Sequence, residues 1–176
     1  HLVAVGEEVA VVADIYADGH EVLAAVLRFR RAGGEWAEVP MSPEANDRWE
    51  SRFGVAELGR YEYTIQAWID RFATWRRDLG KKVDAGQDVT ADLLEGAELI
   101  CQTAGRAGAA DAEWLRGRAD VIGGRGDPEA RARAALEPAL ASVMAHHADR
   151  SSGAFYDKTL SVIVDRERAR FGAWYE

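Results

Sequence analysis

The spacing of apolar residues in this sequence changes near residue 86 from a period of two to a helical period. Up to that point apolar and polar residues alternate in short runs, of which residues 61–69 form the clearest. Such alternation predicts strands with one face on a core and the other in water. Runs at this spacing indicate an antiparallel β-sandwich, and they cover residues 9–15, 23–29, 35–39, 49–53, 61–69 and 74–83.

Glycine-containing turns connect two pairs of these predicted strands. Gly33-Gly34 can supply the positive φ angles of a tight hairpin. Gly59 stands two residues before Tyr61 at the start of a strand, which is the spacing of a tyrosine corner in immunoglobulin-like sandwiches. In that motif the phenol hydrogen-bonds back to the preceding loop. An ordinary turn followed by a core tyrosine explains the same residues, so both interpretations remain open.

Residues 88–150 have helical spacing instead. Apolar residues recur every three or four positions from Leu93 to Ala104, and Asp127-Pro128 has the form of an N-cap followed by a proline in the first turn. Pro138 would break a helix interior, so it separates two helices, and Asp111 is a predicted N-cap. We therefore expect four short helices, at residues 93–104, 111–122, 128–136 and 138–148.

Strand spacing returns near the C-terminus, where Leu160, Val162 and Val164 alternate with other residues. A single strand is not stable alone, so we expect it to complete the sandwich begun at residue 9. The predicted fold is mainly β plus α, an immunoglobulin-like antiparallel β-sandwich with an inserted small four-helix bundle. The predicted domains are residues 1–87 for the first part of the sandwich, 88–154 for the bundle, and 155–176 for the last strand and a linker.

Charge and composition argue against several function classes. The chain has 22 basic and 30 acidic residues, a net charge of −8, so we expect neither nucleic acid nor an anionic membrane as a partner. No run approaches 18 apolar residues, and we expect neither a transmembrane helix nor a secretion signal. The single cysteine, Cys101, lies in an apolar helix stripe, which predicts an inert buried thiol and suits a cytoplasmic, reducing compartment.

No catalytic or metal-binding constellation is recognisable in the sequence. His146 and His147 are neighbours on a predicted helix, so their side chains diverge by about 100° and do not converge on one ion. The glycine-rich loop at residues 123–127 lacks the Gly-Lys-Ser/Thr ending of a phosphate loop and does not follow a strand. We therefore predict no catalytic residue, no metal site and no cofactor.

Tryptophan is the residue type that most favours a binding role. The chain has six, and Trp68 falls on the outward phase of its strand. Exposed indoles can stack on sugar rings or pack against another domain or subunit. We favour the second interpretation, because the sequence has the appearance of a piece of a longer protein. The candidates for a carbohydrate or interface contact are Trp68, Trp75, Arg76, Trp114, Trp174 and Tyr175.

Three motifs resemble one enzyme family. Residues 68–76, the pair Arg48-Trp49, and the C-terminal stretch 164–176 are similar to the N-terminal region of α-1,4-glucan:maltose-1-phosphate maltosyltransferases, which are α-amylase-like enzymes. Phe72 departs from this resemblance, which would place a tryptophan there. The resemblance implies an immunoglobulin-like sandwich interrupted by a helical bundle and followed by a catalytic (β/α)₈ barrel.

The same resemblance implies a function. The barrel of such enzymes transfers maltosyl units from α-maltose 1-phosphate to α-1,4-glucans with retention, and the enzymes are homodimers. We expect the barrel to follow this chain, so no catalytic residue is assigned within it. The chain would then be a non-catalytic accessory and dimerisation region of a cytoplasmic enzyme, in contact with its own barrel, a second subunit and α-glucan. The alternatives are a stand-alone carbohydrate-binding module and an independent small enzyme.

Overall fold

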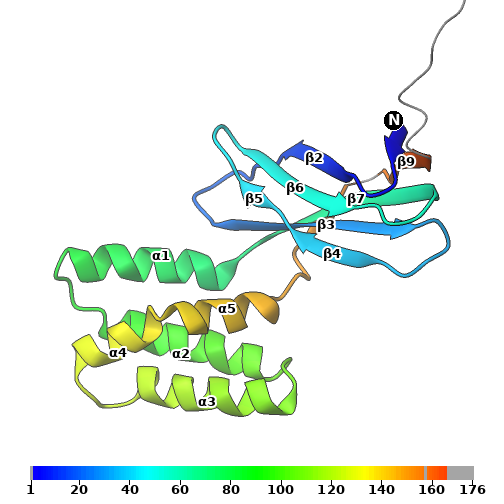
Figure 1. Ribbon diagram of the computed structural model, residues 1–176. Coiled ribbons are helices and arrows are strands. Elements are labelled where there is room, and N and C mark those ends of the chain that lie inside the picture. The colour runs from blue at the N-terminus through cyan, green and yellow to red at the C-terminus, as the bar shows by residue number, and fades with distance from the viewer. Residues whose placement is uncertain (1, 157, 166–176) are drawn as a thin grey trace, which may run out of the picture. The chain divides into compact units, whose positions relative to one another are not determined.

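The chain forms two compact units, one of strands and one of helices. The computed structural model describes residues 2–156 and 158–165 (Figure 1). Among these residues, the β unit comprises 2–19, 23–68, 152–156 and 158–165, and the helical unit comprises 20–22 and 69–151. The chain thus leaves the β unit after Trp68 and returns to it at Ser152. The fold is of the mixed α/β kind.

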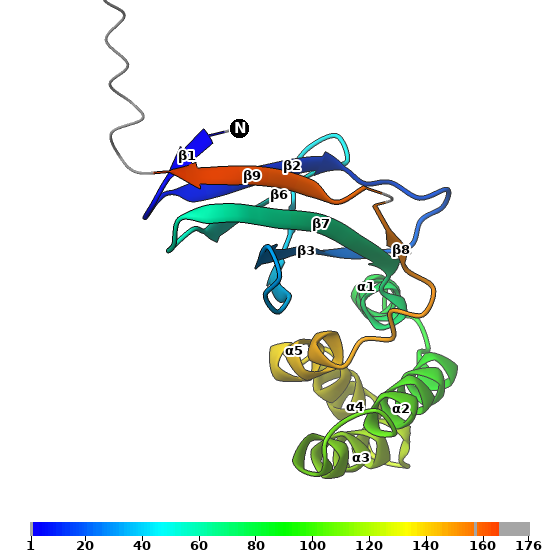
Figure 2. The same ribbon diagram turned by 90° about the vertical axis from the view of Figure 1, so that its right-hand side faces the viewer.

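Two sheets make up the β unit. In the larger sheet β9 lies between β1 and β7, with which it pairs parallel and antiparallel respectively, and Figure 2 shows β9 beside β7. Its strands are β1 (Leu2–Ala4), β9 (Leu160–Asp165), β7 (Gly59–Ile69), β3 (Leu23–Arg31) and β4 (Ala37–Pro40) in this order, with β8 (Ala154–Phe155) also paired to β7. The smaller sheet is antiparallel and contains β2 (Glu8–Asp14), β6 (Arg48–Gly54) and β5 (Ser42–Pro43).

An aromatic cluster joins the two sheets. Phe53 of β6 stacks on Phe29 of β3 with ring centroids 4.6 Å apart. Tyr61 and Tyr63 of β7 lie 6.3 and 5.9 Å from the same Phe53 ring. Since β6 belongs to one sheet and β3 and β7 to the other, these rings close a common core. The aliphatic side chains of that core include Val9, Val11, Leu27, Val55, Val162 and Val164.

The turn before β7 has the hydrogen bond expected of a tyrosine corner. The Glu57 N–H group donates to Tyr61 Oη at 3.4 Å. Gly59 has a φ of 132°, a conformation that side-chain-bearing residues rarely adopt. The predicted return bond from the phenol to the loop is therefore confirmed. The strands predicted in residues 9–69, and the final strand at residues 160–165, are confirmed as well.

The expectation that β7 exposes one face to water is wrong for its second half. Thr64, Gln66 and Trp68 lie on the phase opposite the core, yet each is less than 10% exposed, and Trp68 is only 5% exposed. Thr64 Oγ1 donates to the carbonyl oxygens of Tyr156 and Lys158 at 3.4 Å, so the returning chain satisfies this buried hydroxyl. Trp68 is accordingly not the exposed indole that its phase predicted.

Five helices, one more than predicted, form the helical unit. They are α1 (Arg71–Asp84), α2 (Thr90–Ala104), α3 (Ala109–Gly123), α4 (Pro128–Ala135) and α5 (Pro138–His146). Their core includes Phe72, Trp75, Leu79, Leu93, Ile100, Leu115, Ile122, Leu140 and Met144.

Helix α1 replaces the strand predicted at residues 74–83. Asp70 caps its first turn, because its Oδ1 accepts a hydrogen bond from Ala73 N at 2.8 Å. Phe72, Trp75 and Leu79 are all buried, and their spacing of three and four residues places them on one helix face. This helical pattern prevailed over the weaker alternation in the same residues.

Within the other helices, most of the predicted boundaries are confirmed. Asp127 Oδ2 accepts a hydrogen bond from Ala130 N at 3.0 Å, with Pro128 in the first turn, and a new helix begins at Pro138. The predicted cap at Asp111 is wrong. Helix α3 begins at Ala109, so Asp111 lies inside its first turn, where its carboxylate contacts His147 Nε2 at 2.7 Å.

The prediction of a buried thiol is also wrong, because Cys101 is exposed. The apolar stripe of α2 is rotated from the predicted one. Its buried side consists of Leu93, Gly96, Ile100, Thr103 and Ala104, while Leu94 is 55% exposed.

Gly96 is essential to the packing of α1 on α2. The indole of Trp75 lies directly against it, and Trp75 Nε1 donates to Asp92 O at 2.9 Å. A Cβ atom at position 96 would stand 2.0 Å from Trp75 Cζ2, far inside van der Waals contact.

We predict that Gly96→Ala lowers the free energy of unfolding by about 1–3 kcal/mol or more, because the indole has to move out of a packed core. Gly117→Ala in α3 is the matched control. No atom lies within 4 Å of a Cβ atom at that position, so this change should stabilise the helix by about 0.5–1 kcal/mol. Urea unfolding of both variants measures the difference, and equal stabilities would contradict the packing described.

We also predict that Tyr61→Phe costs about 0.5–1.5 kcal/mol of stability, because Glu57 N loses its phenol acceptor. Tyr16→Phe should be neutral, since Tyr16 is 75% exposed. Thermal unfolding of the two variants compares them. If the Tyr61→Phe protein is as stable as the Tyr16→Phe protein, the hydrogen bond to Tyr61 does not contribute to stability.

Candidate functional site

The sequence-predicted site residues that the structure describes belong to two different units. Trp68 is buried in the β unit, and Trp75 is buried in the helical core. Arg76 follows Trp75 on α1, and Trp114 lies on α3. Trp174 and Tyr175 lie outside the described residues. Neither Trp68 nor Trp75 therefore presents an open indole face for sugar stacking, whereas their role as interface residues stays a prediction.

Arg76 belongs to a set of arginines that bind carbonyl groups at the ends of helices. Its guanidinium donates to Leu136 O, just after α4, at 2.6 Å. Arg118 donates to Ala134 O at 3.3 Å, and the buried Arg131 donates to Ile122 O at 2.8 Å. The last carbonyls of a helix lack intrahelical partners and carry partial negative charge. These three side chains therefore support the architecture of the helical unit.

Trp114 is the sequence-predicted candidate whose indole is accessible in the described part of the chain. It is 38% exposed, and the Arg118 guanidinium lies 5.7 Å from its ring centroid. Two aliphatic side chains of the same unit, Leu94 and Val121, are more than half exposed. The helical unit thus presents apolar surface to its surroundings.

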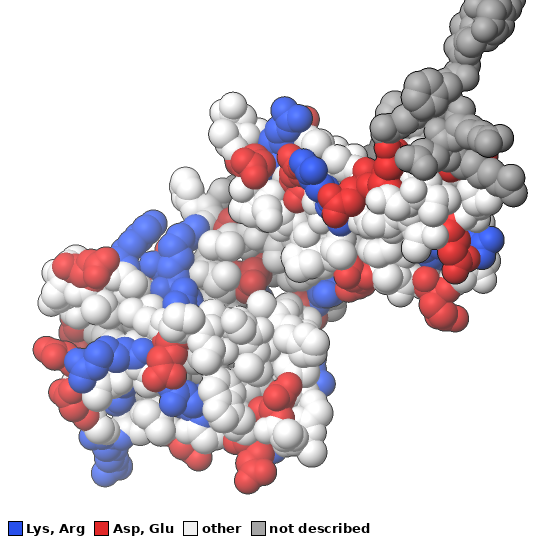
Figure 3. Space-filling model, in the orientation of Figure 1, with Lys and Arg blue, Asp and Glu red and all other residues white. Residues whose placement is uncertain are grey.

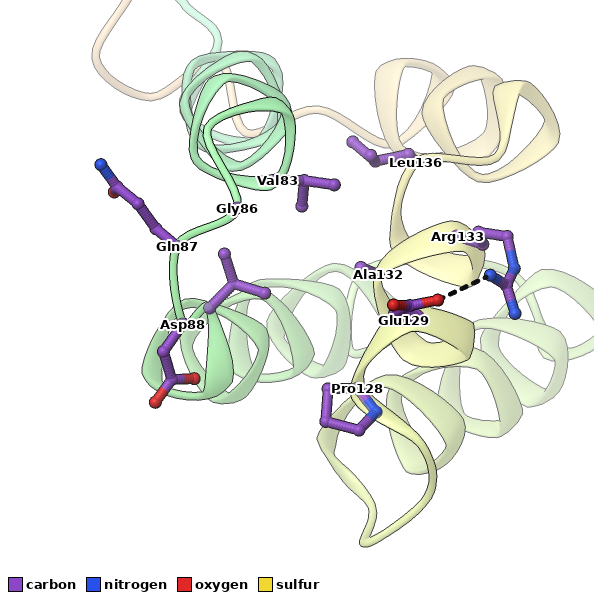
Figure 4. A pocket seen from close by; sticks show the side chains of 10 residues that line it. Val83, Gly86, Gln87, Asp88, Pro128, Glu129, Ala132, Arg133 and Leu136 are labelled. Carbon is purple, nitrogen blue, oxygen red and sulfur yellow. Dashed lines mark ion pairs between the residues drawn. The ribbon is translucent and has the colours of Figure 1, made fainter.

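A cleft of about 360 Å³ opens between the end of α1, the loop to α2, and α4 (Figure 4). Val83 and Leu136 point into it, and Ala132 and Pro128 form its wall on the α4 side. Gln87 points away from the cleft toward solvent. The lining is mostly apolar, so the cleft suits an apolar group better than a charged one.

The charged groups at the rim of the cleft are engaged locally. Asp88 accepts hydrogen bonds from Thr90 Oγ1 at 2.7 Å and Thr90 N at 2.9 Å, and these bonds lower the pKa of its carboxyl group. Glu129 and Arg133 pair with each other at 3.8 Å across one turn of α4. Neither pair is arranged around a reacting centre, so the cleft is a candidate for contact and not for catalysis.

Trp36 is not among the site residues predicted from the sequence, yet it is partly exposed just before β4. The guanidinium carbons of Arg30 and Arg28 lie 4.5 and 5.3 Å from its ring centroid. Arg30 pairs with Glu62 at 2.8 Å, and Arg28 pairs with Glu38 at 3.2 Å. The sequence signal that could have identified this cluster is the placement of Arg28 and Arg30 on one face of a strand, directly before the predicted hairpin turn that leads to Trp36.

Charges of both signs share the face of the molecule drawn in Figure 3. Figure 3 shows acidic and basic side chains interspersed over the face that it presents. Among the described residues no group of three or more His, Cys, Asp or Glu side chains is placed to hold a metal ion. Helices of the described part are also too short or too polar to cross a membrane.

Comparison with known sequences shows to which family the chain belongs. Residues 3–166 match the family model of α-1,4-glucan:maltose-1-phosphate maltosyltransferase, domain N/S. The chain belongs to this family, as its motifs led us to expect.

Relatives with this activity in their names match nearly the whole chain. The maltosyltransferase of Myxococcus xanthus is 48% identical over 98% of the chain, which is 27% of the relative. That of Chlorobaculum tepidum is 40% identical over 97% of the chain and 26% of its own length. Streptomyces coelicolor maltosyltransferase 1 is 36% identical over the same shares. The chain therefore spans about a quarter of the length of these relatives.

Proposed function

We propose that this chain is the non-catalytic N-terminal accessory region of a maltosyltransferase. The whole protein would transfer maltosyl units from α-maltose 1-phosphate to α-1,4-glucans in the cytoplasm. The observation that carries the proposal is the family match over residues 3–166, because the relatives bear this activity in their names and the chain corresponds to about a quarter of each. The transfer chemistry would reside in the remaining three quarters.

The accessory role has two parts, support of the catalytic barrel and dimerisation. An apolar cleft bounded by Val83, Val89 and Leu136 is surface suited to packing against the rest of the protein. The exposed Leu94, Val121 and Trp114 of the helical unit are suited to contact with a second copy. We also propose that the β unit is immunoglobulin-like, which the two sheets around one core and the bond to Tyr61 support.

We predict that the 176-residue chain alone does not transfer maltosyl groups. The purified chain and the full-length protein are each incubated with α-maltose 1-phosphate and maltohexaose, and phosphate release is measured. Only the full-length protein should release phosphate. Release by the chain itself, abolished by a substitution within it, would contradict the accessory role.

For the dimer we predict self-association that strengthens with salt. The net charge of −8 opposes the approach of two copies, and about 0.15 M salt screens this repulsion while leaving apolar contacts intact. Sedimentation equilibrium over a salt series measures the dimer fraction. Leu94→Glu should reduce it, whereas Leu58→Glu, on the β unit, should not. The reverse result would exclude the helical surface as the interface.

A further inference from the structure

We infer that Trp36 and the two arginine–glutamate pairs beside it form a shallow binding site for a neutral carbohydrate chain. This Trp36 platform consists of Trp36, Arg28, Arg30, Glu38 and Glu62. It lies wholly within the β unit, on β3, β4, β7 and the turn before β4. In taking the carbohydrate to be an α-glucan, the inference rests on the proposed function.

The strand register fixes how the indole lies. Arg28 is directly opposite Glu38 in the β3–β4 pair, and the same register continued by two residues places Arg30 opposite Trp36. Leu27 and Phe29 point into the core, so Arg28 and Arg30 project from the other face of β3. Both guanidinium groups lie within 5.3 Å of the ring centroid, and cation–π attraction favours this arrangement. Trp36 is itself partly exposed, so part of the indole is accessible to a ligand.

Ion pairs hold the supporting groups in position. Arg30 Nε donates to Glu62 Oε2 at 2.9 Å while another of its nitrogen atoms lies 2.8 Å from the same oxygen. Arg28 Nε lies 3.2 Å from Glu38 Oε1. The four charged side chains are between 20 and 36% exposed, so they are partly shielded yet reachable from solvent. An indole held this way loses little conformational freedom when a ligand stacks on it.

The chemistry of the platform matches a pyranose. A sugar ring has an apolar C–H face that can lie on an indole, and hydroxyl groups at its edge. Those hydroxyls can donate to carboxylate oxygens of Glu38 and Glu62 and accept from guanidinium N–H groups, of which each arginine has five. Two arginines and two glutamates balance in charge, so the site has no preference for phosphate or another anion. A surface formed by paired strands suits a chain that extends over it.

Trp114 provides a comparison within the same molecule. It is also accessible and lies near an arginine, Arg118, which pairs with Glu137 at 2.5 Å. However, the described part of the chain places a single guanidinium near its ring, and the distance of 5.7 Å is longer than either distance at Trp36. Because Trp114 is also part of the proposed dimer surface, the control variant is Tyr16→Ala, which removes an exposed aromatic ring of the β unit.

Affinity electrophoresis of the full-length protein in glycogen-containing gels tests the inference. Trp36→Ala should weaken glycogen binding about threefold to tenfold, and Trp36→Leu should do the same because leucine keeps apolar bulk without an aromatic face. Trp36→Phe should retain part of the affinity, and Tyr16→Ala should retain all of it. Cooperative thermal unfolding is required of each variant before binding is measured.

Kinetics separate this site from the catalytic one. With a short acceptor such as maltotetraose, Trp36→Ala should leave kcat and KM unchanged, while the KM for glycogen should rise. Unchanged glycogen affinity in both Trp36→Ala and Trp36→Leu would overturn the inference, and so would an altered dimer fraction with no change in glycogen affinity. A full-length protein without maltosyl transfer that still binds glycogen through Trp36 would refute the proposed function and leave the platform standing.

Discussion

The arrangement of the helical unit depends on how the chain passes from strand to helix at Asp70. Its carboxylate accepts a hydrogen bond from Ala73 N, and its carbonyl oxygen accepts one from Thr74 Oγ1, each at 2.8 Å. Val22 holds both residues, because its carbonyl accepts from Asp70 N at 2.8 Å and its N–H donates to Thr74 Oγ1 at 2.9 Å. These four bonds set the start and direction of α1. The side of α1 that carries Trp75 then meets α2 at Gly96, where any side chain would collide with the indole.

The spacing of apolar residues and the identity of the turn residues were sufficient to predict most strands and helices. They failed at α1, which was predicted as a strand. Trp75 and Leu79 are four residues apart, a spacing compatible with a strand as well as a helix. Arg77 breaks the strand alternation between them, and Phe72, three residues before Trp75, fits only the helix. An aspartate between two predicted strands is typical of a turn, but Asp70 is the N-cap of α1. Val22, which hydrogen-bonds to Asp70 and Thr74, is distant from them in sequence. A local sequence pattern therefore does not predict this contact.

Burial was harder to predict than secondary structure, because periodicity identifies a face but not what covers it. Trp68 lies on the outward phase of β7 and is nevertheless buried, together with Thr64 and Gln66. Cys101 lies at the margin of the α2 stripe, and a rotation of the helix toward Gly96 and Thr103 leaves it exposed. Gly96 and Thr103 have little hydrophobic character of their own. They are buried because the bulky Trp75 requires a small neighbour and because Thr103 Oγ1 donates to Leu99 O at 3.0 Å.

The contrast between Trp75 and Trp36 follows from the same reasoning. An indole is large and apolar, with one polar N–H group, so its place depends on the space and charge that its neighbours offer. Opposite Trp75 stands a glycine, and the ring enters the core with its N–H satisfied by Asp92 O. Beside Trp36 lie two arginines that are paired with glutamates, and burying such charged pairs costs free energy. They keep the indole at the surface, where its outer face is available to a ligand without net charge. Replacing Arg30 by an aliphatic residue should therefore let the ring settle onto the sheet, which removes the site without removing the tryptophan.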